Sequence, residues 1–180
     1  LTMVAKRRPQ EWRIEMHRGP DPYADTLHVD VPCDPGATHP DAEVNRYAVG
    51  ATDEPFTVSP VLASRAVIAN PEVPFLLPPK ERVTAYVTTP IWLEIGDGPS
   101  RTLGELAVQQ VQDTWFGPDT VTGTLCFASR TQLRLDPDEL IPRPWRAITP
   151  VVLQNTADTT LTVERVRLPV PNLPLYQAAD

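Results

Sequence analysis

The chain has 180 residues, a formal net charge of −7, and a composition that is 41% hydrophobic and 22% charged. A chain of this length buries a substantial core as one domain, and this composition excludes wholesale disorder. Nucleic acid is not expected as a partner, because binding to phosphates requires a positively charged surface.

Proline is the most unusual feature of the composition, with 22 prolines against 8 glycines. Proline fixes φ, lacks a backbone N–H and breaks helix interiors. The prolines are spread along the chain and leave few windows long enough for a helix. We therefore expect short strands joined by rigid, proline-rich turns.

The expected location follows from two absences in the sequence. No apolar run approaches the ~20 residues that span a bilayer, and the N-terminal residues lack a signal-peptide pattern. We expect a soluble, cytoplasmic protein without membrane insertion. The two cysteines, Cys33 and Cys126, are far apart and in no metal-spaced pair, which favours two buried thiols over a disulfide.

In the first half of the chain, alternating apolar and polar residues predict strands at 12–16 and 27–31, with shorter strands at 44–49 and 56–58. A β-rich run follows at 61–69. The strongest strand patterns of the middle region are 82–88 and, after Pro90, 91–95.

One segment has helical spacing. Thr102 to Glu105 fits a capping box, and Leu103, Leu106 and Val111 recur at roughly helical intervals. This predicts a short helix from residue 102 to 111. Gly104 in its first turn leaves a strand through 108–116 as the alternative.

The last third predicts strands at 121–128, 131–135, 145–154 and 160–168, with a hairpin-like connection at 155–158. Close strand spacing and frequent turns are typical of an all-β fold, either an antiparallel β-sandwich or a partly open barrel. We expect a single domain over 1–180, with less regular N-terminal strands at 1–58 and the main sandwich at 59–178.

Short motifs in the second half carry a family resemblance. They are Trp115-Phe116-Gly117-Pro118, Gly123 to Cys126, Leu153 to Thr156, the strand from Val163 to Pro169, and Leu173-Pro174-Leu175-Tyr176. In this order they resemble the family catalogued as domain of unknown function 432, which is best represented in archaea. The resemblance covers roughly residues 75–177 and implies a compact β domain. It brings no activity and no catalytic residues.

The N-terminal part contains every histidine of the chain, close to acidic and cysteine side chains. His28 and Asp30 alternate onto one strand face, and His39 or Cys33 folding back would complete a zinc or iron site. This predicts His28, Asp30 and His39 as metal ligands. The competing interpretation is a polar outer face on an edge strand, interrupted by prolines.

A second candidate site surrounds Trp145, where Arg143 and Arg146 flank the indole and favour a binding surface. Trp92 and Trp115, like Trp145, are expected either in the core or on a stacking surface for a sugar.

Motifs for common catalytic chemistry are absent. The sequence contains no Gly-x-Ser-x-Gly and no phosphate-binding glycine loop, and Cys126 lies mid-strand as a core filler rather than a nucleophile. We therefore assign no catalytic residue and no cofactor. The leading hypothesis is a non-enzymatic binding or assembly module, acting through self-association or a protein partner. The alternatives are a metal-binding protein or metal-dependent enzyme, and a carbohydrate-binding module.

Overall fold

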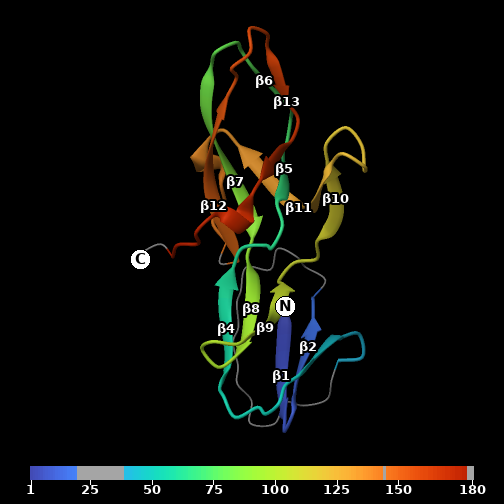
Figure 1. Cartoon of the computed structure of the whole chain (residues 1–180). Helices are drawn as coiled ribbons and strands as arrows, with labels where there is room; N and C mark the ends of the chain where they lie inside the picture. Colours follow the sequence, from blue (N-terminus) through green and yellow to red (C-terminus); the bar gives the residue numbers. More distant parts are fainter. Residues whose placement is uncertain (20–38, 144, 178–180) are drawn as a thin grey trace. The chain divides into compact units, whose positions relative to one another are not determined.

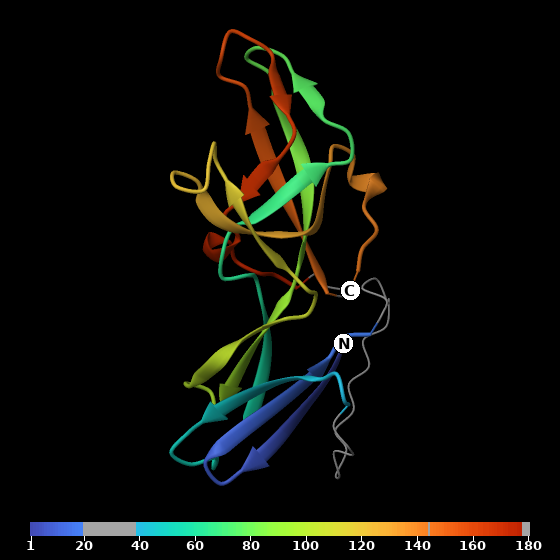
Figure 2. The same ribbon diagram turned by 90° about the vertical axis from the view of Figure 1, so that its right-hand side faces the viewer.

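The computed structural model describes residues 1–19, 39–143 and 145–177 (Figures 1 and 2). Over these residues the all-β prediction is confirmed, since they contain fourteen strands, two short 3₁₀ turns and no α-helix. The sheets of the described residues are not closed into a barrel, which is consistent with the predicted β-sandwich. No helix of this part of the chain is long and apolar enough to cross a membrane.

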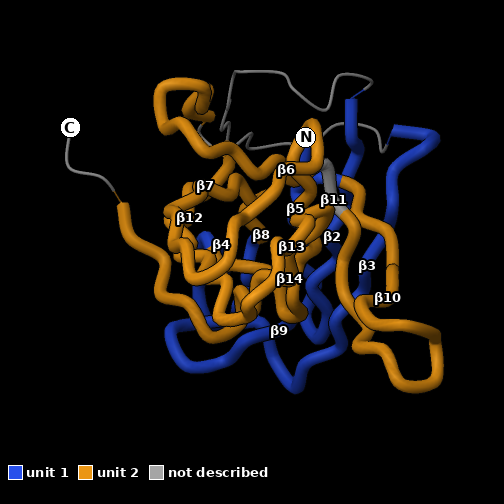
Figure 3. The backbone as a smooth tube through the Cα atoms, turned by 90° about the horizontal axis from the view of Figure 1, so that it is seen from above, with its two compact units in different colours: residues 1–60, 93–109 blue, residues 61–92, 110–180 orange. Residues whose placement is uncertain are grey.

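The chain divides into two compact units, coloured separately in Figure 3. Unit 1 comprises Leu1–Pro60 and Leu93–Gln109, and unit 2 comprises Val61–Trp92 and Gln110–Asp180. This division into units does not test the expectation of a single domain, which stays a prediction.

Unit 1 contains two three-stranded sheets. The first has the order β1-β2-β3 and is antiparallel throughout; its strands are β1 (Thr2–Arg8), β2 (Glu11–His17) and β3 (Glu43–Ala48). The second has the order β4-β8-β9; its strands are β4 (Phe56–Val61), β8 (Trp92–Asp97) and β9 (Thr102–Ala107). Val61 and Trp92, at the ends of β4 and β8, are the residues at which the chain passes into and out of unit 2.

The core of unit 1 lies between these two sheets. The alternating residues Trp12, Ile14 and Met16 of β2 pack with Ile95 of β8 and Leu106 of β9. Alternation places every second side chain of a strand on the same face, so β2 buries one apolar face. The indole N–H of Trp12 donates a buried hydrogen bond of 3.0 Å to Asp97 Oδ1, which satisfies the polar atom of the largest core side chain.

Unit 2 is built on a six-stranded sheet. The main order is β12-β7-β11-β5-β14, and β10 pairs with β11. Its strands are β5 (Val67–Pro71), β7 (Arg82–Pro90), β10 (Gln112–Phe116), β11 (Thr124–Arg134), β12 (Arg146–Gln154) and β14 (Val166–Leu168). A separate two-stranded ribbon pairs β6 (Phe75–Leu77) with β13 (Leu161–Val163), visible beside the end of β7 and β12 in Figures 1 and 2.

The core of unit 2 includes a small cluster of buried side chains. Ala66, Ile68 and Cys126 form it, and Phe116 packs against them. Val87 and Leu133, on neighbouring strands, are also buried. The 3₁₀ turn at Val170–Asn172 anchors the C-terminal segment by burying Val170. This agrees with the apolar character of the tail.

Several predicted elements differ from the structure. The expected helix at 102–111 is wrong: residues 102–107 form strand β9. Its spacing resembled a helix, but Tyr47 lies so close to Gly104 that an added Cβ would be 3.0 Å from the phenolic oxygen. Packing on the neighbouring sheet therefore overrides the local helical pattern.

Strand pairing also departs from the expected order. The run 160–168 forms two strands, and β13 pairs with β6 while β14 pairs with β5, so residues 155–158 do not close a hairpin. The two runs at 121–135 form one strand, β11, which pairs with β5 in parallel. Strand β1, which contains Lys6 to Arg8, was not predicted, although it pairs with β2 along its whole length.

Candidate functional site

The glycines among the residues that carry the family resemblance close the turn between β10 and β11. Gly117 has φ of 146°, and a Cβ added to it would lie 2.7 Å from the Gly123 Cα. Asp119 fastens the same loop by accepting hydrogen bonds from the backbone N–H groups of Val121 and Thr122. These bonds hold the pKa of the Asp119 carboxyl below its usual value. The two glycines are thus required by backbone geometry.

Asn155 and Cys126, from the same set of motifs, are also structural. The buried Asn155 amide donates to the carbonyl oxygens of Leu77, Pro78 and Thr159 at 2.8–3.0 Å. Cys126 is a fully buried free thiol, and burial raises its pKa. This placement fits a core filler, since a reactive thiol needs a depressed pKa and access to solvent.

The predicted metal ligands are only partly covered by the structure. His28, Asp30 and Cys33 lie outside the described residues. His39 is described, and its ring stacks on that of His17 with centroids 3.6 Å apart. Its Nδ1 accepts a hydrogen bond from the Asp41 backbone N–H. No group of three or more His, Cys, Asp or Glu in the described residues is arranged to hold a metal, and the site at His28, Asp30 and His39 stays a prediction.

The predicted binding residues Arg143, Trp145 and Arg146 form the turn that starts β12. The Trp145 carbonyl accepts a hydrogen bond of 2.8 Å from the Ile91 N–H, and the Arg146 N–H donates to the Arg143 carbonyl at 3.1 Å. All three side chains are half-buried. The turn is therefore ordered by backbone bonds, and its role in binding stays a prediction.

The tryptophans divide between core and surface. Trp12 and Trp92 are buried, and the Trp92 ring lies 5.0 Å from that of Phe127. Trp115 is 41% exposed. Trp92 is thus unavailable for stacking on a sugar, and the carbohydrate-binding alternative depends on Trp115 and the half-buried Trp145.

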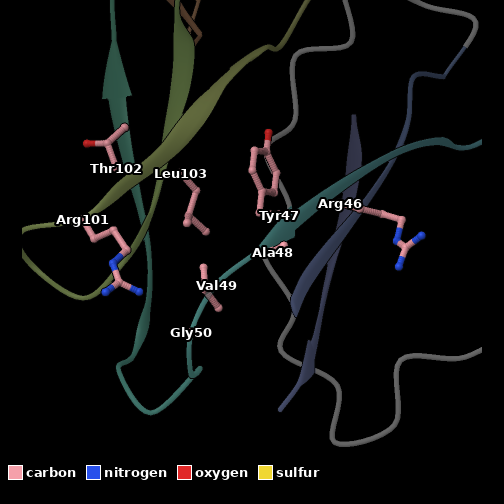
Figure 4. A pocket seen from close by; sticks show the side chains of 8 residues that line it. All are labelled: Arg46, Tyr47, Ala48, Val49, Gly50, Arg101, Thr102 and Leu103. Atoms are coloured by element: carbon pink, nitrogen blue, oxygen red, sulfur yellow. The ribbon is translucent and has the colours of Figure 1, made fainter. Parts of the chain in front are cut away.

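Unit 1 has an open hollow of about 560 Å³ between β3 and the start of β9 (Figure 4). Arg46 and Arg101 are the charged side chains that line it. The Arg46 guanidinium donates two hydrogen bonds of 2.8 Å to Glu11, and Arg101 pairs with the buried Asp97 at 3.1 Å. Both cations are therefore already neutralised.

The two arginines do not converge on a common point in the hollow. Arg46 and Tyr47 are consecutive residues of β3, so their side chains leave opposite faces of the strand, as Figure 4 shows. Tyr47 faces the core of unit 1, and Arg46 faces Glu11. The Arg46 bond holds the pKa of Glu11 below its usual value. This geometry stabilises the sheet and does not assemble an anion site.

The exposed face of β12 is different in character. Arg146, Ile148, Pro150 and Val152 alternate onto one face of this strand, and we call them the β12 ridge. Ile148 is 42% exposed and Val152 is 50% exposed, although both belong to regular strand structure. The ridge adjoins the predicted Trp145 turn. Its apolar residues were visible in the sequence as alternation, but alternation alone does not tell which face is covered.

Comparison with known proteins identifies the family of the chain but not a function. No curated protein and no solved structure matches the chain. The whole chain, residues 1–180, matches the family described as protein of unknown function (DUF432). The resemblance noted over residues 75–177 is thus confirmed and extends to the N-terminal part. The chain belongs to the DUF432 family.

Proposed function

We propose that this chain is a non-enzymatic binding module that holds a partner protein on the β12 ridge and the adjoining Trp145 turn. The observation that carries the proposal is the exposure of Ile148 and Val152 on one face of a regular strand, on either side of Pro150. Contiguous apolar side chains on an ordered surface favour burial against another molecule.

The position of β12 supports contact through its side chains. β12 is the last strand of the sheet order, so one of its edges lacks a strand neighbour within the described residues. Pro150 stands at its centre and lacks a backbone N–H. A proline in an edge strand disfavours the addition of a further strand. A partner is therefore expected to cover the ridge and not to extend the sheet.

Charge at the two ends of the ridge favours a different protein over a second copy. Arg146 begins β12, and Arg82 of β7 lies opposite its last residue, Gln154. Two copies related by a two-fold axis would bring these arginines together in either orientation. A partner that combines apolar and acidic side chains matches both features of the surface.

The test is a double substitution on the ridge, Ile148→Glu with Val152→Glu. We expect the variant to lose the partners that wild-type protein captures under matched conditions, as identified by quantitative mass spectrometry. The control is Val121→Glu, which alters a fully exposed valine in the β10–β11 loop of the same unit. Trp145→Ala and Arg146→Ala then extend the test to the turn.

Three outcomes separate the hypotheses. Selective loss of captured protein in the ridge variant supports the proposal. Identical capture by the ridge variant and wild type contradicts it. If purified wild-type protein forms a dimer that the ridge variant abolishes in analytical ultracentrifugation, the occupant is a second copy and the argument from charge is wrong.

A further inference from the structure

Unit 2 contains a second surface, at the C-terminal end of β12. A cleft of about 370 Å³ lies there, and its lining is mainly apolar. Leu153, which follows Val152 and therefore leaves the other face of the strand, lines the cleft together with Leu77, Phe116, Leu161 and Val163. Its volume is in the range of small-molecule sites. We call it the apolar cleft.

Two arginines, Arg165 and Arg167, line the apolar cleft. They are two residues apart at the start of β14, and the Arg165 guanidinium lies 5.4 Å from the centre of the Phe116 ring. Neither forms an ion pair with a carboxylate of the described residues. Eight other basic side chains do so, namely Lys6, Arg13, Arg18, Arg46, Arg65, Lys80, Arg101 and Arg134, whereas Arg7, Arg8 and Arg82 likewise form no ion pair in the described residues.

The position of Arg165 and Arg167 in the lining of an apolar cleft indicates the chemistry of a ligand. In a chain with 23 acidic residues, two neighbouring arginines without carboxylate partners leave positive charge uncompensated beside an apolar surface. Guanidinium groups bind carboxylates through charge-assisted hydrogen bonds, and the leucine and valine side chains favour a hydrocarbon. We propose that the apolar cleft binds a small aliphatic carboxylate, with its carboxylate on Arg165 and Arg167 and its chain against Leu153, Leu161 and Val163.

The probes that separate charge from hydrocarbon are octanoate, octanol and acetate. We expect octanoate to shift the methyl NMR signals of Leu153, Leu161 and Val163 saturably, and octanol to shift them with about tenfold weaker affinity, because it lacks the charge. Acetate, which lacks the chain, is expected to leave these signals unchanged. Added salt should weaken octanoate binding and leave octanol binding unaffected.

The matched variants are Arg165→Gln with Arg167→Gln, and Arg65→Gln as the control. Arg65 is an exposed arginine of the same unit that pairs with Asp113 outside the cleft. The double substitution should reduce octanoate affinity to that of octanol and leave octanol affinity unchanged, whereas Arg65→Gln should change neither. Leu161→Glu, at a half-exposed wall position, should abolish the binding of both ligands while the rest of the spectrum stays folded.

Three results would overturn the assignment. They are shifts that map outside the apolar cleft, equal affinity for octanoate and octanol, and octanoate binding that survives the double arginine substitution. The ridge variant Ile148→Glu with Val152→Glu should bind octanoate normally, so the failure of this inference and the failure of the proposed function are distinguishable.

Discussion

The two units differ in the number of large apolar side chains that they expose and in the number of basic side chains that pair with carboxylates. Of the large apolar side chains that are exposed in the described residues, three belong to unit 1: Leu1, Val44 and Val58. Ten belong to unit 2: Val73, Leu76, Trp115, Val121, Leu135, Ile141, Ile148, Val152, Leu161 and Tyr176. In the described residues, ion pairs with carboxylates involve five basic side chains of unit 1 and at least three of the larger unit 2. Within the described residues, unit 2 therefore exposes more large apolar side chains than unit 1.

In unit 1 the carboxylate of Glu15 forms ion pairs inside the unit. Its side chain is buried, and it forms ion pairs of 2.8 Å with both Lys6 and Arg13. A buried carboxylate is tolerated only when it is paired and hydrogen-bonded. This difference between the units directs the search for partners to unit 2. The following experiments test the difference.

The largest expected effect is on unit 1. Trp12→Ala removes the biggest core side chain and leaves Asp97 without its indole donor. Substitutions of this kind cost about 3–5 kcal/mol in unfolding free energy. Urea denaturation followed by circular dichroism measures the loss. Trp12→Phe, which keeps a ring beside Phe56 but removes the N–H, should cost less; an equal loss for both variants would assign the effect to the hydrogen bond alone.

Next in size is the buried amide of unit 2. Asn155→Ala leaves the carbonyl groups of Leu77, Pro78 and Thr159 without their donor, which should cost about 1–3 kcal/mol of unfolding free energy. Thr160→Ala, at an exposed position in the same connection, is the matched control and should change stability by less than about 0.5 kcal/mol. Equal values for the two variants would refute the structural role given to Asn155.

These core positions also show what sequence patterns can and cannot predict. The alternation of apolar and polar residues predicted the ends of β2, β7 and β12 to within one or two residues. Each of these strands buries one face or pairs with another long strand. The alternation missed β1, because the residues that pair with this strand and neutralise Lys6 are on β2. The 102–107 segment was misassigned for the same reason, since packing against Tyr47 is a tertiary effect.

The candidate sites were less predictable than the fold. The residues that carry the family resemblance, such as Gly117, Gly123 and Asn155, close turns and cap backbone carbonyls, so they identify the family and reveal no chemistry. Arg165 and Arg167 were not predicted as binding residues. The sequence alone does not show whether a basic side chain has a carboxylate partner in the folded protein. The predicted Trp145 turn adjoins the β12 ridge, but its role in binding stays a prediction.

A third experiment asks whether the units unfold together. Cys126 is fully buried, and burial raises the pKa of its thiol. In a Cys33→Ser variant the thiol reagent DTNB should therefore label Cys126 at least about 1,000-fold more slowly in folded than in unfolded protein. If Trp12→Ala accelerates this labelling as much as it lowers global stability, the units unfold as one. Unchanged labelling would show that unit 2 is independent.

The smallest expected effect is at alkaline pH. Burial, with a smaller contribution from the charge of Glu43, raises the pKa of the Tyr47 phenol above its usual value. The folded state therefore favours the neutral phenol, so this stabilisation is complete below about pH 10 and is lost as pH rises further. Tyr47→Phe should flatten the decline of stability from about pH 9 to about pH 11, measured by urea titration. Parallel curves for the two proteins would contradict this account.

The division of unit 1 into two chain segments has a consequence for biosynthesis. All residues of the apolar face of β2 have been synthesised when the chain reaches residue 17. Ile95 and Leu106 cover this face, and they follow only after about thirty residues of unit 2 have been made. At translation rates of about 5–20 residues per second, the interval lasts several seconds. During that time Trp12, Ile14 and Met16 are without their final partners on the nascent chain. We therefore expect the emerging β1–β3 sheet to expose this apolar face until the second segment of unit 1 has been made.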